Sequence, residues 1–292
     1  MNSVATIIPV HRYSKLVIKA INSALNQDYD HNKVFVVINT TEDNLLNILK
    51  NEYKNAIEII YIKELGVSYA RNNGINRSES KYIAFLDSDD VWKEDKLSTQ
   101  ISFMEENNYL ISGALMKYST NETVSKYNVG AFKMDQSGIK AAKRMPFPIS
   151  SLVLDRSVIR DEELFSENLG SNDYGQIEDL EFISRLANKH KIGVFLSNCG
   201  EYFINPDGAT QKDFIKQRSA AKRLSALRKS GRGDFINNFE YKIEKNNRIY
   251  SEMFAYRFMI SNVNKSYIKS LIYLVLALVL NPISFIGRLL RR

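Results

Sequence analysis

A short apolar run that ends in three carboxylates constrains this chain more than any other feature. Residues 82–86 read Tyr-Ile-Ala-Phe-Leu, and Asp87, Ser88, Asp89 and Asp90 follow directly. Such runs are typical of buried parallel strands, and open α/β sheets bind ligands at the carboxyl ends of their strands. Since Mg²⁺ and Mn²⁺ prefer carboxylate oxygens together with substrate phosphates, the run predicts a metal–diphosphate site. The alternative is an acidic turn that caps the next helix, because Asp is a good N-cap.

The residues before this run alternate between strand-like and helical patterns. Strands are predicted over 4–10, 34–38 and 57–62, and helices over 16–25 and 66–75. Pro9 is expected to end the first strand, because proline cannot donate to a sheet ladder. Gly74 is expected to end the second helix with a positive φ. The alternation predicts βαβ units, and therefore an α/β fold with a mainly parallel sheet.

The order of these segments resembles that of the family 2 glycosyltransferases, which are inverting enzymes with the nucleotide-sugar-binding GT-A fold. The matching segments are 7–10, 23–29, 66–75 and 82–92. Four segments in this order over residues 4–97 make a specific match. The resemblance implies a Rossmann-like sheet flanked by helices. It also implies transfer of a sugar from a nucleotide diphosphate, most simply a UDP-sugar, to a hydroxyl of a lipid-linked or polysaccharide acceptor.

Within this resemblance the acidic run supplies the metal ligands. Asp89 is the best direct ligand for Mn²⁺ or Mg²⁺, and Asp87 lies on the same side of an extended backbone. The resemblance implies that Asp87 reaches the ribose or a metal-bound water. Asp90 is as well suited to capping a helix that begins near Trp92 as to touching metal. Trp92 itself is open to two interpretations, a sugar-stacking ring or a core aromatic.

Four further residues are candidates for contact with the nucleotide sugar: Pro9, Asn39, Arg71 and Ser88. Asn39 stands where members of the family commonly carry aspartate, but its amide and carbonyl can both pair with a pyrimidine edge. Uracil therefore remains the expected base. Arg71 either serves the nucleotide and its phosphates or is a solvated helix arginine.

The general base is expected in the second half of the chain. Residues 174–186 predict a helix whose first turn is acidic, an arrangement that the helix macrodipole favours in any case. The pair Glu178 and Asp179, with Arg185 six residues after Asp179, resembles the acceptor-base motif of the family. It implies that Asp179 takes the proton of the acceptor hydroxyl, with Glu178 as its neighbour and a candidate acceptor ligand.

Residues 202–212 resemble a mobile loop that in relatives often brings Arg and His to the diphosphate. Phe203 and Asn205 stand in those places here, and Lys212 is the nearby cation that could substitute. The loop is expected to order over the donor.

Charge and hydropathy both change after residue 210. Residues 1–210 hold 23 Lys and Arg against 28 Asp and Glu, whereas residues 211–292 hold 17 against 5. Residues 271–280 are uninterruptedly apolar, too few for a membrane span of about 20 residues. Apolar residues with cations and no anions favour attachment to an anionic membrane surface; a spanning helix and a helix packed on the domain or a partner are the alternatives.

These patterns predict a catalytic domain over 1–210 and a basic helical extension over 211–292. The basic stretch over 212–232 shows neither interleaved aromatics nor a recognisable binding module, so nucleic acid is not an expected partner. Residues 211–262 could form a helical dimer surface, which leaves an oligomer possible. The lone Cys199 fits a reducing compartment and is expected to be buried rather than nucleophilic. The N-terminus shows neither a basic leader nor an apolar signal core. The expected location is peripheral, at the cytoplasmic face of the inner membrane.

Two other functions remain open from the sequence. Residues 87–91 also fit the D-x-D-x-[TV] pattern of haloacid-dehalogenase-like phosphohydrolases, in which the first Asp is a nucleophile. That pattern expects a later Gly-Asp-x-x-x-Asp, and Gly233-Asp234 has no second Asp at that spacing. The other alternative is a non-catalytic, membrane-docked relative that binds nucleotide or scaffolds other enzymes. The unusual Asn39 and the altered loop favour it, whereas the retained acidic residues oppose it.

Overall fold

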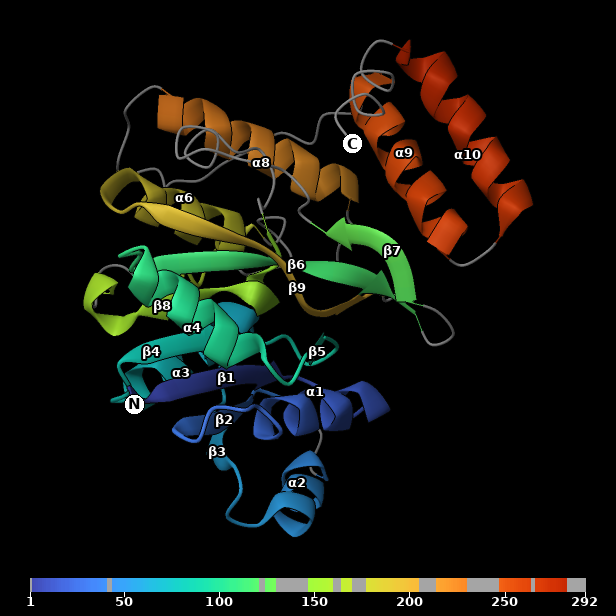
Figure 1. The fold of residues 1–292 in the computed structure, drawn as a ribbon. Helices are drawn as coiled ribbons and strands as arrows, with labels where there is room; N and C mark the ends of the chain where they lie inside the picture. Colours follow the sequence, from blue (N-terminus) through green and yellow to red (C-terminus); the bar gives the residue numbers. More distant parts are fainter. Residues whose placement is uncertain are drawn as a thin grey trace.

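In the residues that the computed structural model describes, a nine-stranded mixed sheet lies between layers of helices (Figure 1). The described residues are 2–40, 44–120, 124–129, 147–159, 164–169, 177–204, 214–229, 247–263 and 266–282. The sheet runs through the middle of the molecule, and three C-terminal helices lie beyond one side of it.

The first half of the sheet is parallel, as the alternating pattern predicts. Its strands are β1 Val4–Val10, β2 Asn32–Ile38, β3 Glu58–Tyr61 and β4 Tyr82–Phe85. The helices between them are α1 Lys15–Leu25, α2 Leu45–Tyr53 and α3 Val67–Arg77. The strand order β3-β2-β1-β4 is parallel throughout, which brings the carboxyl ends of all four strands to one edge.

The second half of the sheet is mixed. Its strands are β5 Val91–Trp92, β6 Ile111–Ser119, β7 Val124–Val129, β8 Val153–Asp155 and β9 Ile192–Phe203. The other elements of this half are α4 Lys96–Glu106, α6 Glu178–Lys189 and two 3₁₀ turns, η1 Ile149–Ser151 and η2 Arg156–Val158. The order continues β4-β8-β6-β9-β5, with β7 paired to β6. β8 is antiparallel to both neighbours, whereas β9 is parallel to β6.

Pro9 does not end the first strand, contrary to the sequence expectation. The carbonyl of Ile7 accepts from the N–H of Leu86 (3.1 Å), so Ile7 and, two residues on, Pro9 turn their backbone groups toward β4. β4 ends at Phe85, before it could pair with Pro9. The strand continues through Pro9 because the missing N–H falls where no neighbouring strand would accept it.

Gly74 does not end α3 either, and its φ is not positive. It lies inside the helix, where an added Cβ would meet Ile7 Cγ2 at 2.6 Å. The glycine therefore permits close helix–strand packing. The positive φ of this region belongs to Gly66, at +130° just before the helix.

The alternation of side chains along the strands builds two hydrophobic cores. Val4, Ile8 and Val10 of β1 face α1, α2 and α4, whereas Ala5 and Ile7 face α3 and α6. The sheet is thus covered on both faces, as in doubly wound folds.

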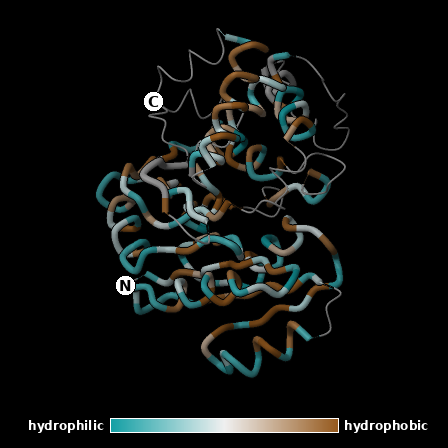
Figure 2. The backbone as a smooth tube through the Cα atoms, turned by 90° about the vertical axis from the view of Figure 1, so that its right-hand side faces the viewer, coloured by the Kyte–Doolittle hydropathy of each residue, from teal (hydrophilic) through white to brown (hydrophobic). Residues whose placement is uncertain are grey.

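The C-terminal helices are α8 Phe214–Lys229, α9 Asn247–Val263 and α10 Tyr267–Leu280. Met259 and Ile260 of α9 pack with Ile204, which follows β9, and α10 packs along α9. Figure 2 shows hydrophobic segments in the central strands and again in the C-terminal helices, outside the sheet. Within the described ranges no helix has the length and apolarity needed to cross a membrane. The domain boundary near residue 210 stays a prediction.

Candidate active site

The acidic run lies where the sequence places it, just beyond β4 at the edge formed by the strand carboxyl ends. Pro9 lies near the end of β1 and Asn39 directly after β2, so both reach the same edge as Asp87. Asn39 is buried, and its side-chain amide donates to the carbonyl of Gly66 (2.8 Å). That bond ties the end of β2 to the start of α3.

Asp90 caps no helix, contrary to one of the two sequence interpretations. It is buried and accepts hydrogen bonds from the Ser150 hydroxyl and from the Phe203 N–H (2.9 Å). The Ser150 oxygen in turn accepts from the Asp87 N–H (3.0 Å). Asp90 is therefore the acid that braces the turn against η1 and β9, which leaves Asp87 and Asp89 on the open side.

Trp92 belongs to the core, but on strand β5 rather than on a helix, because α4 begins only at Lys96. Its indole N–H donates to the carbonyl of Ser150 (2.6 Å), and the Lys96 ammonium lies 4.0 Å from its ring centre. Burial lowers the pKa of Lys96 to about 7. Cys199 is buried as expected, and burial raises the pKa of its thiol to about 12, so it is not a ready nucleophile.

Arg71 joins the acidic run to the start of α6. Its guanidinium donates to Asp87 Oδ1 and to Glu178 Oε1, both at 2.9 Å, and only 3% of the residue is exposed. Its guanidinium carbon also lies over the Phe165 ring, 5.2 Å from the ring centre. The alternative of a solvated helix arginine is therefore wrong. Both terminal nitrogens have protein partners, so direct contact between Arg71 and a nucleotide stays a prediction.

Glu178 and Asp179 form the first turn of α6, as the sequence predicts. The Leu180 N–H donates to Asp179 Oδ1 (2.6 Å), which fixes that carboxylate at the helix start. Removal from water and the neighbouring Glu178 raise the pKa of Asp179 to about 7. Burial also raises the pKa of Glu178, against the pull of Arg71. A carboxyl group with a pKa near neutrality is suited to accept a proton at physiological pH.

Asp89 is a partly buried carboxylate with like charge beside it in the run. Burial and the charge of Asp87 raise its pKa to about 6, and Arg12 offsets this only partly. Arg12 was missed by the sequence reasoning, although its place two residues after β1 puts it at the same edge. Ser88 lies between the two acids and is half-buried.

The donor set fits a hard divalent cation. Such ions in nucleotide sites usually take one or two carboxylates and complete their shell with phosphate and water oxygens. Asp87 and Asp89 supply two carboxylates whose mutual repulsion a cation would relieve. In the part of the chain that the structure describes, no group of three or more His, Cys, Asp or Glu side chains could hold a metal ion. Asn205 and Lys212, the loop residues expected near the diphosphate, lie outside the described residues.

Comparison with known proteins identifies a family. The family model described as Glycosyl transferase family 2 matches residues 5–161. An uncharacterized glycosyltransferase of Rickettsia bellii is 34% identical over 212 residues, which cover 71% of this chain and 29% of that protein. The UDP-Glc:alpha-D-GlcNAc-diphosphoundecaprenol beta-1,3-glucosyltransferase WfaP of Escherichia coli is 29% identical, over 55% of this chain and 64% of that protein. The matches span only 29% to 31% of the length of three rickettsial relatives.

Solved structures share the fold. The TarS 1–349 structure from S. aureus in complex with UDP-GlcNAc superposes with a TM-score of 0.62 at 17% identity, covering 93% of this chain and 79% of that one. The mannosyltransferase PcManGT from Pyrobaculum calidifontis, in complex with GDP-Man and Mn²⁺, has a TM-score of 0.55 at 12% identity, over 97% and 87% of the two chains. At these identities the likeness concerns the fold alone, which is the GT-A fold.

Proposed function

This chain belongs to glycosyl transferase family 2, and from that premise we propose that it transfers a sugar from a nucleotide diphosphate to an acceptor hydroxyl. The observation that carries the proposal is the buried Arg71, whose two ion pairs bring Asp87 and the Glu178–Asp179 turn to one place. Two acidic segments far apart in the sequence thereby face one reaction centre. The haloacid-dehalogenase alternative is rejected, because the match to the glycosyl transferase family 2 model includes the acidic run.

We assign the leaving diphosphate to the side of Asp87 and Asp89, with Mn²⁺ or Mg²⁺ as the cation. When bound, the cation supplies Lewis-acid neutralisation of the leaving diphosphate. Asp89 is the proposed direct ligand, and Asp87 holds its position through Arg71 while it contacts the metal, a metal-bound water or the ribose. The Mn²⁺ named with the mannosyltransferase PcManGT supports a divalent ion without selecting one.

Pro9, Asn39, Arg71 and Ser88 are the proposed contacts of the nucleotide sugar. Pro9 and Asn39 lie at the strand ends beside the acidic run, where a ligand of an open α/β sheet is expected. The donor is proposed to be a UDP-sugar, since UDP-GlcNAc and UDP-Glc are named for two similar proteins. The acceptor is proposed to be lipid-linked or a polysaccharide, in keeping with the diphosphoundecaprenol named for WfaP.

Asp179 is the proposed general base. Its carboxylate takes the proton of the acceptor hydroxyl, whose oxygen then attacks the anomeric carbon opposite the diphosphate. The configuration is thereby inverted, and no covalent enzyme intermediate is needed. Glu178, held by Arg71, fixes the first turn of α6 and stands ready to contact the acceptor. With a pKa of about 7, Asp179 is partly ionised at neutral pH and can return its proton to water afterwards.

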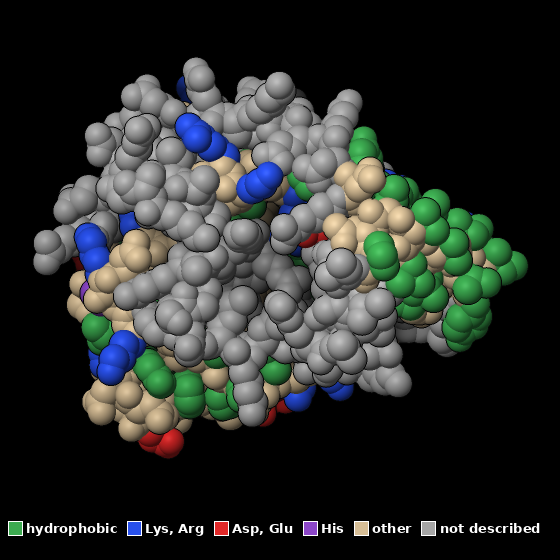
Figure 3. Space-filling view, turned by 90° about the horizontal axis from the view of Figure 1, so that it is seen from above, with side chains coloured by type: hydrophobic (Ala, Val, Ile, Leu, Met, Phe, Trp, Pro, Cys, Tyr) green, Lys and Arg blue, Asp and Glu red, His purple; other side chains and the backbone are tan. Residues whose placement is uncertain are grey.

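We further propose that α10 attaches the enzyme to the surface of an anionic membrane. Seven large apolar residues of α10 are exposed, which Figure 3 shows as a hydrophobic area at one end of the molecule: Tyr267, Ile268, Leu271, Ile272, Val275, Leu276 and Val279. The small residues Ser270 and Ala277 are the ones buried in α10, and Ser251 of α9 donates to the Ala277 carbonyl (2.9 Å). A helix that hides its small residues and exposes its large ones offers its apolar face to lipid.

The charge of this region favours an anionic lipid partner. The sequence after Glu252 contains no carboxylate side chain, while two lysines and four arginines follow it: Arg257, Lys265, Lys269, Arg288, Arg291 and Arg292. Cations beside an apolar face are attracted to negatively charged headgroups. Peripheral attachment at the cytoplasmic face of the inner membrane would bring the active site to a lipid-linked acceptor. An oligomer also remains a prediction.

The donor site can be tested by thermal unfolding of the purified protein with UDP, GDP, CDP and dTDP, each with Mn²⁺ or with EDTA. We expect UDP with Mn²⁺ to raise the melting temperature by several degrees, because a ligand at 100 times its Kd stabilises the fold by about 2.7 kcal/mol. Asp89→Ala should abolish the metal-dependent part of this shift. Asp95→Ala removes an exposed acid six residues further along the chain and should leave the shift unchanged.

A folded wild-type protein that responds to none of the four diphosphates would refute the donor site. Binding of UDP without any turnover of UDP-sugars, across neutral and lipid-linked acceptors, would instead favour the non-catalytic scaffold.

A further inference from the structure

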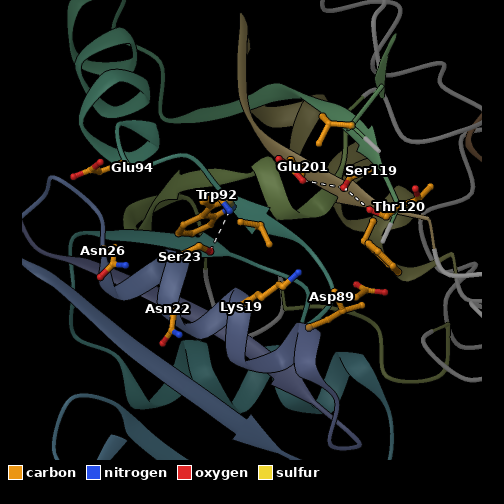
Figure 4. Close-up of a pocket in the computed structure, with 14 residues that line it drawn as sticks. Lys19, Asn22, Ser23, Asn26, Asp89, Trp92, Glu94, Ser119, Thr120 and Glu201 are labelled. Atoms are coloured by element: carbon orange, nitrogen blue, oxygen red, sulfur yellow. Dashed lines mark hydrogen bonds between the residues drawn. The ribbon is translucent and has the colours of Figure 1, made fainter. Parts of the chain in front are cut away.

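A pocket of about 640 Å³ lies beside Asp89, on the α1 side of the sheet edge (Figure 4). Three parts of the chain line it: α1, the acidic run with β5, and the ends of β6 and β9 together with the start of β7. Among the described residues assigned above to donor, metal and base, Asp89 alone lines this pocket. The pocket therefore adjoins the proposed donor site at one residue and extends away from it.

The two long walls of the pocket carry hydrogen-bonding side chains. Lys19, Asn22 and Asn26 line it from α1, and all three are exposed. Figure 4 shows Lys19 reaching from α1 into the space, with Ser119 and Glu201 on the opposite wall. The Ser119 hydroxyl donates to Glu201 Oε2 (2.9 Å), which holds that carboxylate in place. Amides, hydroxyls and carboxylates arranged this way match the alternating donors and acceptors of a saccharide.

The lining also includes apolar side chains. They belong to Leu16, Val91, Trp92, Val124 and Phe203. Trp92 is held at both ends, because its indole N–H donates to Ser150 and its backbone N–H donates to the Ser23 hydroxyl (3.1 Å). A pocket lined by both apolar and polar side chains suits a sugar ring, which presents C–H groups on its faces and hydroxyls on its rim.

The charge of the pocket selects against anions. Among its described lining residues, Asp89, Glu94 and Glu201 are carboxylates, and Lys19 is the cation. Even when the charge of Asp89 is taken up by a metal, two carboxylates remain against one ammonium. A uronic acid or a phosphate in this pocket would face net repulsion, whereas an uncharged sugar would find both donors and acceptors.

We propose that this pocket binds an uncharged saccharide portion of the acceptor. The inference rests on the proposed function, since it is the shared residue Asp89 that connects the pocket to the reaction centre. The acceptor then extends past Asp89 along α1, and its reacting sugar projects from the pocket toward the diphosphate and Asp179. The anionic part of a lipid-linked acceptor lies outside the pocket.

The experiment measures saccharide binding by saturation-transfer NMR on the full chain with UDP and Mn²⁺ present. The probes are N,N′-diacetylchitobiose, which is uncharged, and a disaccharide of glucuronic acid and N-acetylglucosamine, which is of similar size. We expect binding of the uncharged probe and at least threefold weaker binding of the acidic one. Lys19→Ala removes a hydrogen-bond donor, and Asn26→Trp narrows the pocket. Each variant should bind the uncharged probe at least threefold more weakly than the wild type.

Lys15→Ala is the matched control, because Lys15 is an exposed lysine one turn earlier on α1 and outside the pocket lining. It should leave binding unchanged, and melting temperatures report whether each variant is folded. The proposal is overturned if the wild type binds neither probe, if the acidic probe binds as well as the neutral one, or if Lys19→Ala and Asn26→Trp bind like the control. Failure of the proposed function would be distinguishable: UDP would then give no thermal shift, whatever the saccharides do.

Discussion

At the scale of single residues, the small number of cations near the carboxylates determines the pKa values of the site. Arg71 serves Asp87 and Glu178 together, which leaves Asp89 and Asp179 with raised pKa values. Removing either partner of such a buried pair leaves an uncompensated charge, which costs about 3–5 kcal/mol. The ion pairs of Arg71 are with Asp87 and Glu178, whereas Asp89 and Asp179 are the proposed direct metal ligand and general base.

Asp179→Asn should raise stability increasingly as pH rises, while it lowers activity. In the folded chain the pKa of Asp179 is about 7, above the usual value of about 3.9 for an unfolded chain. The folded state holds this proton more tightly, so the stability contributed by the group is present at low pH and is lost as pH rises through about 7. Asn does not ionise. The melting temperature of the variant minus that of the wild type should therefore grow from pH 5 to pH 8 in EDTA.

Transfer activity should fall about 10²–10⁴-fold in the same variant, because a general base is lost. In the wild type, kcat should decline as pH falls below about 7, where Asp179 becomes protonated. A variant that keeps wild-type activity, or a melting-temperature difference that does not change with pH, would contradict this role.

At this scale the sequence could single out candidate acids, but not how they are paired. Asp87, Asp89, Glu178 and Asp179 follow from local pattern and family resemblance. The inward turn of Arg71 does not, because its partner Glu178 lies 107 residues further along the chain. The bracing role of Asp90 was hidden for the same reason, since Ser150 and Phe203 reach it only in the folded sheet.

At the scale of elements, close packing between α3 and β1 sets the geometry of the Arg71 pair. Gly74 allows α3 to approach Ile7, and Arg71 lies one turn earlier on the same helix. Local patterns predicted β1, β2, β3, β4 and α1 well, because each strand contains an apolar run and α1 has apolar residues at helical spacing. They missed β5, whose two residues become a strand only by pairing with Gly200 and Glu201 of β9.

Gly74→Ala tests this packing. Alanine favours an isolated helix by about 1 kcal/mol over glycine. Here its Cβ would lie 2.6 Å from Ile7 Cγ2, and overpacking of a core typically costs about 1–3 kcal/mol. We therefore expect net destabilisation in denaturant unfolding. The same change made in an Ile7→Ala background should lower the free energy of unfolding by less, since the clash is gone. Equal losses in both backgrounds would show that the contact with Ile7 does not cause the destabilisation.

At the scale of the whole molecule, α9 packs with Ile204 after β9, and α10 packs along α9. Large apolar side chains of α10 are left exposed. The sequence predicted a membrane-associating segment from residues 271–280 and their cations. It could not tell which face of the helix would remain open, because that depends on the fit of Ser270 and Ala277 against α9. The described part of the segment ends at residue 282, so the predicted behaviour of residues 283–292 lies outside it.

Leu271→Glu should weaken binding to vesicles of phosphatidylglycerol and phosphatidylethanolamine at least tenfold in a co-sedimentation assay. The reason is that burial of one large aliphatic side chain contributes about 1.5–3 kcal/mol. Leu65→Glu is the matched control, because Leu65 is 64% exposed, close to the 62% of Leu271, and lies in the loop before α3. Equal loss, or no loss, in the two variants would contradict attachment through α10.

The shared guanidinium of Arg71 also constrains how such enzymes can be recombined. Chimeras that join the first half of this chain to the second half of a relative have a natural crossover between residues 92 and 147, after the acidic run and before η1. Any such crossover separates Arg71 from Glu178, and Asp87 from Ser150. A viable hybrid must therefore inherit both contacts as compatible pairs, so specificity for donor and acceptor cannot be exchanged as independent modules.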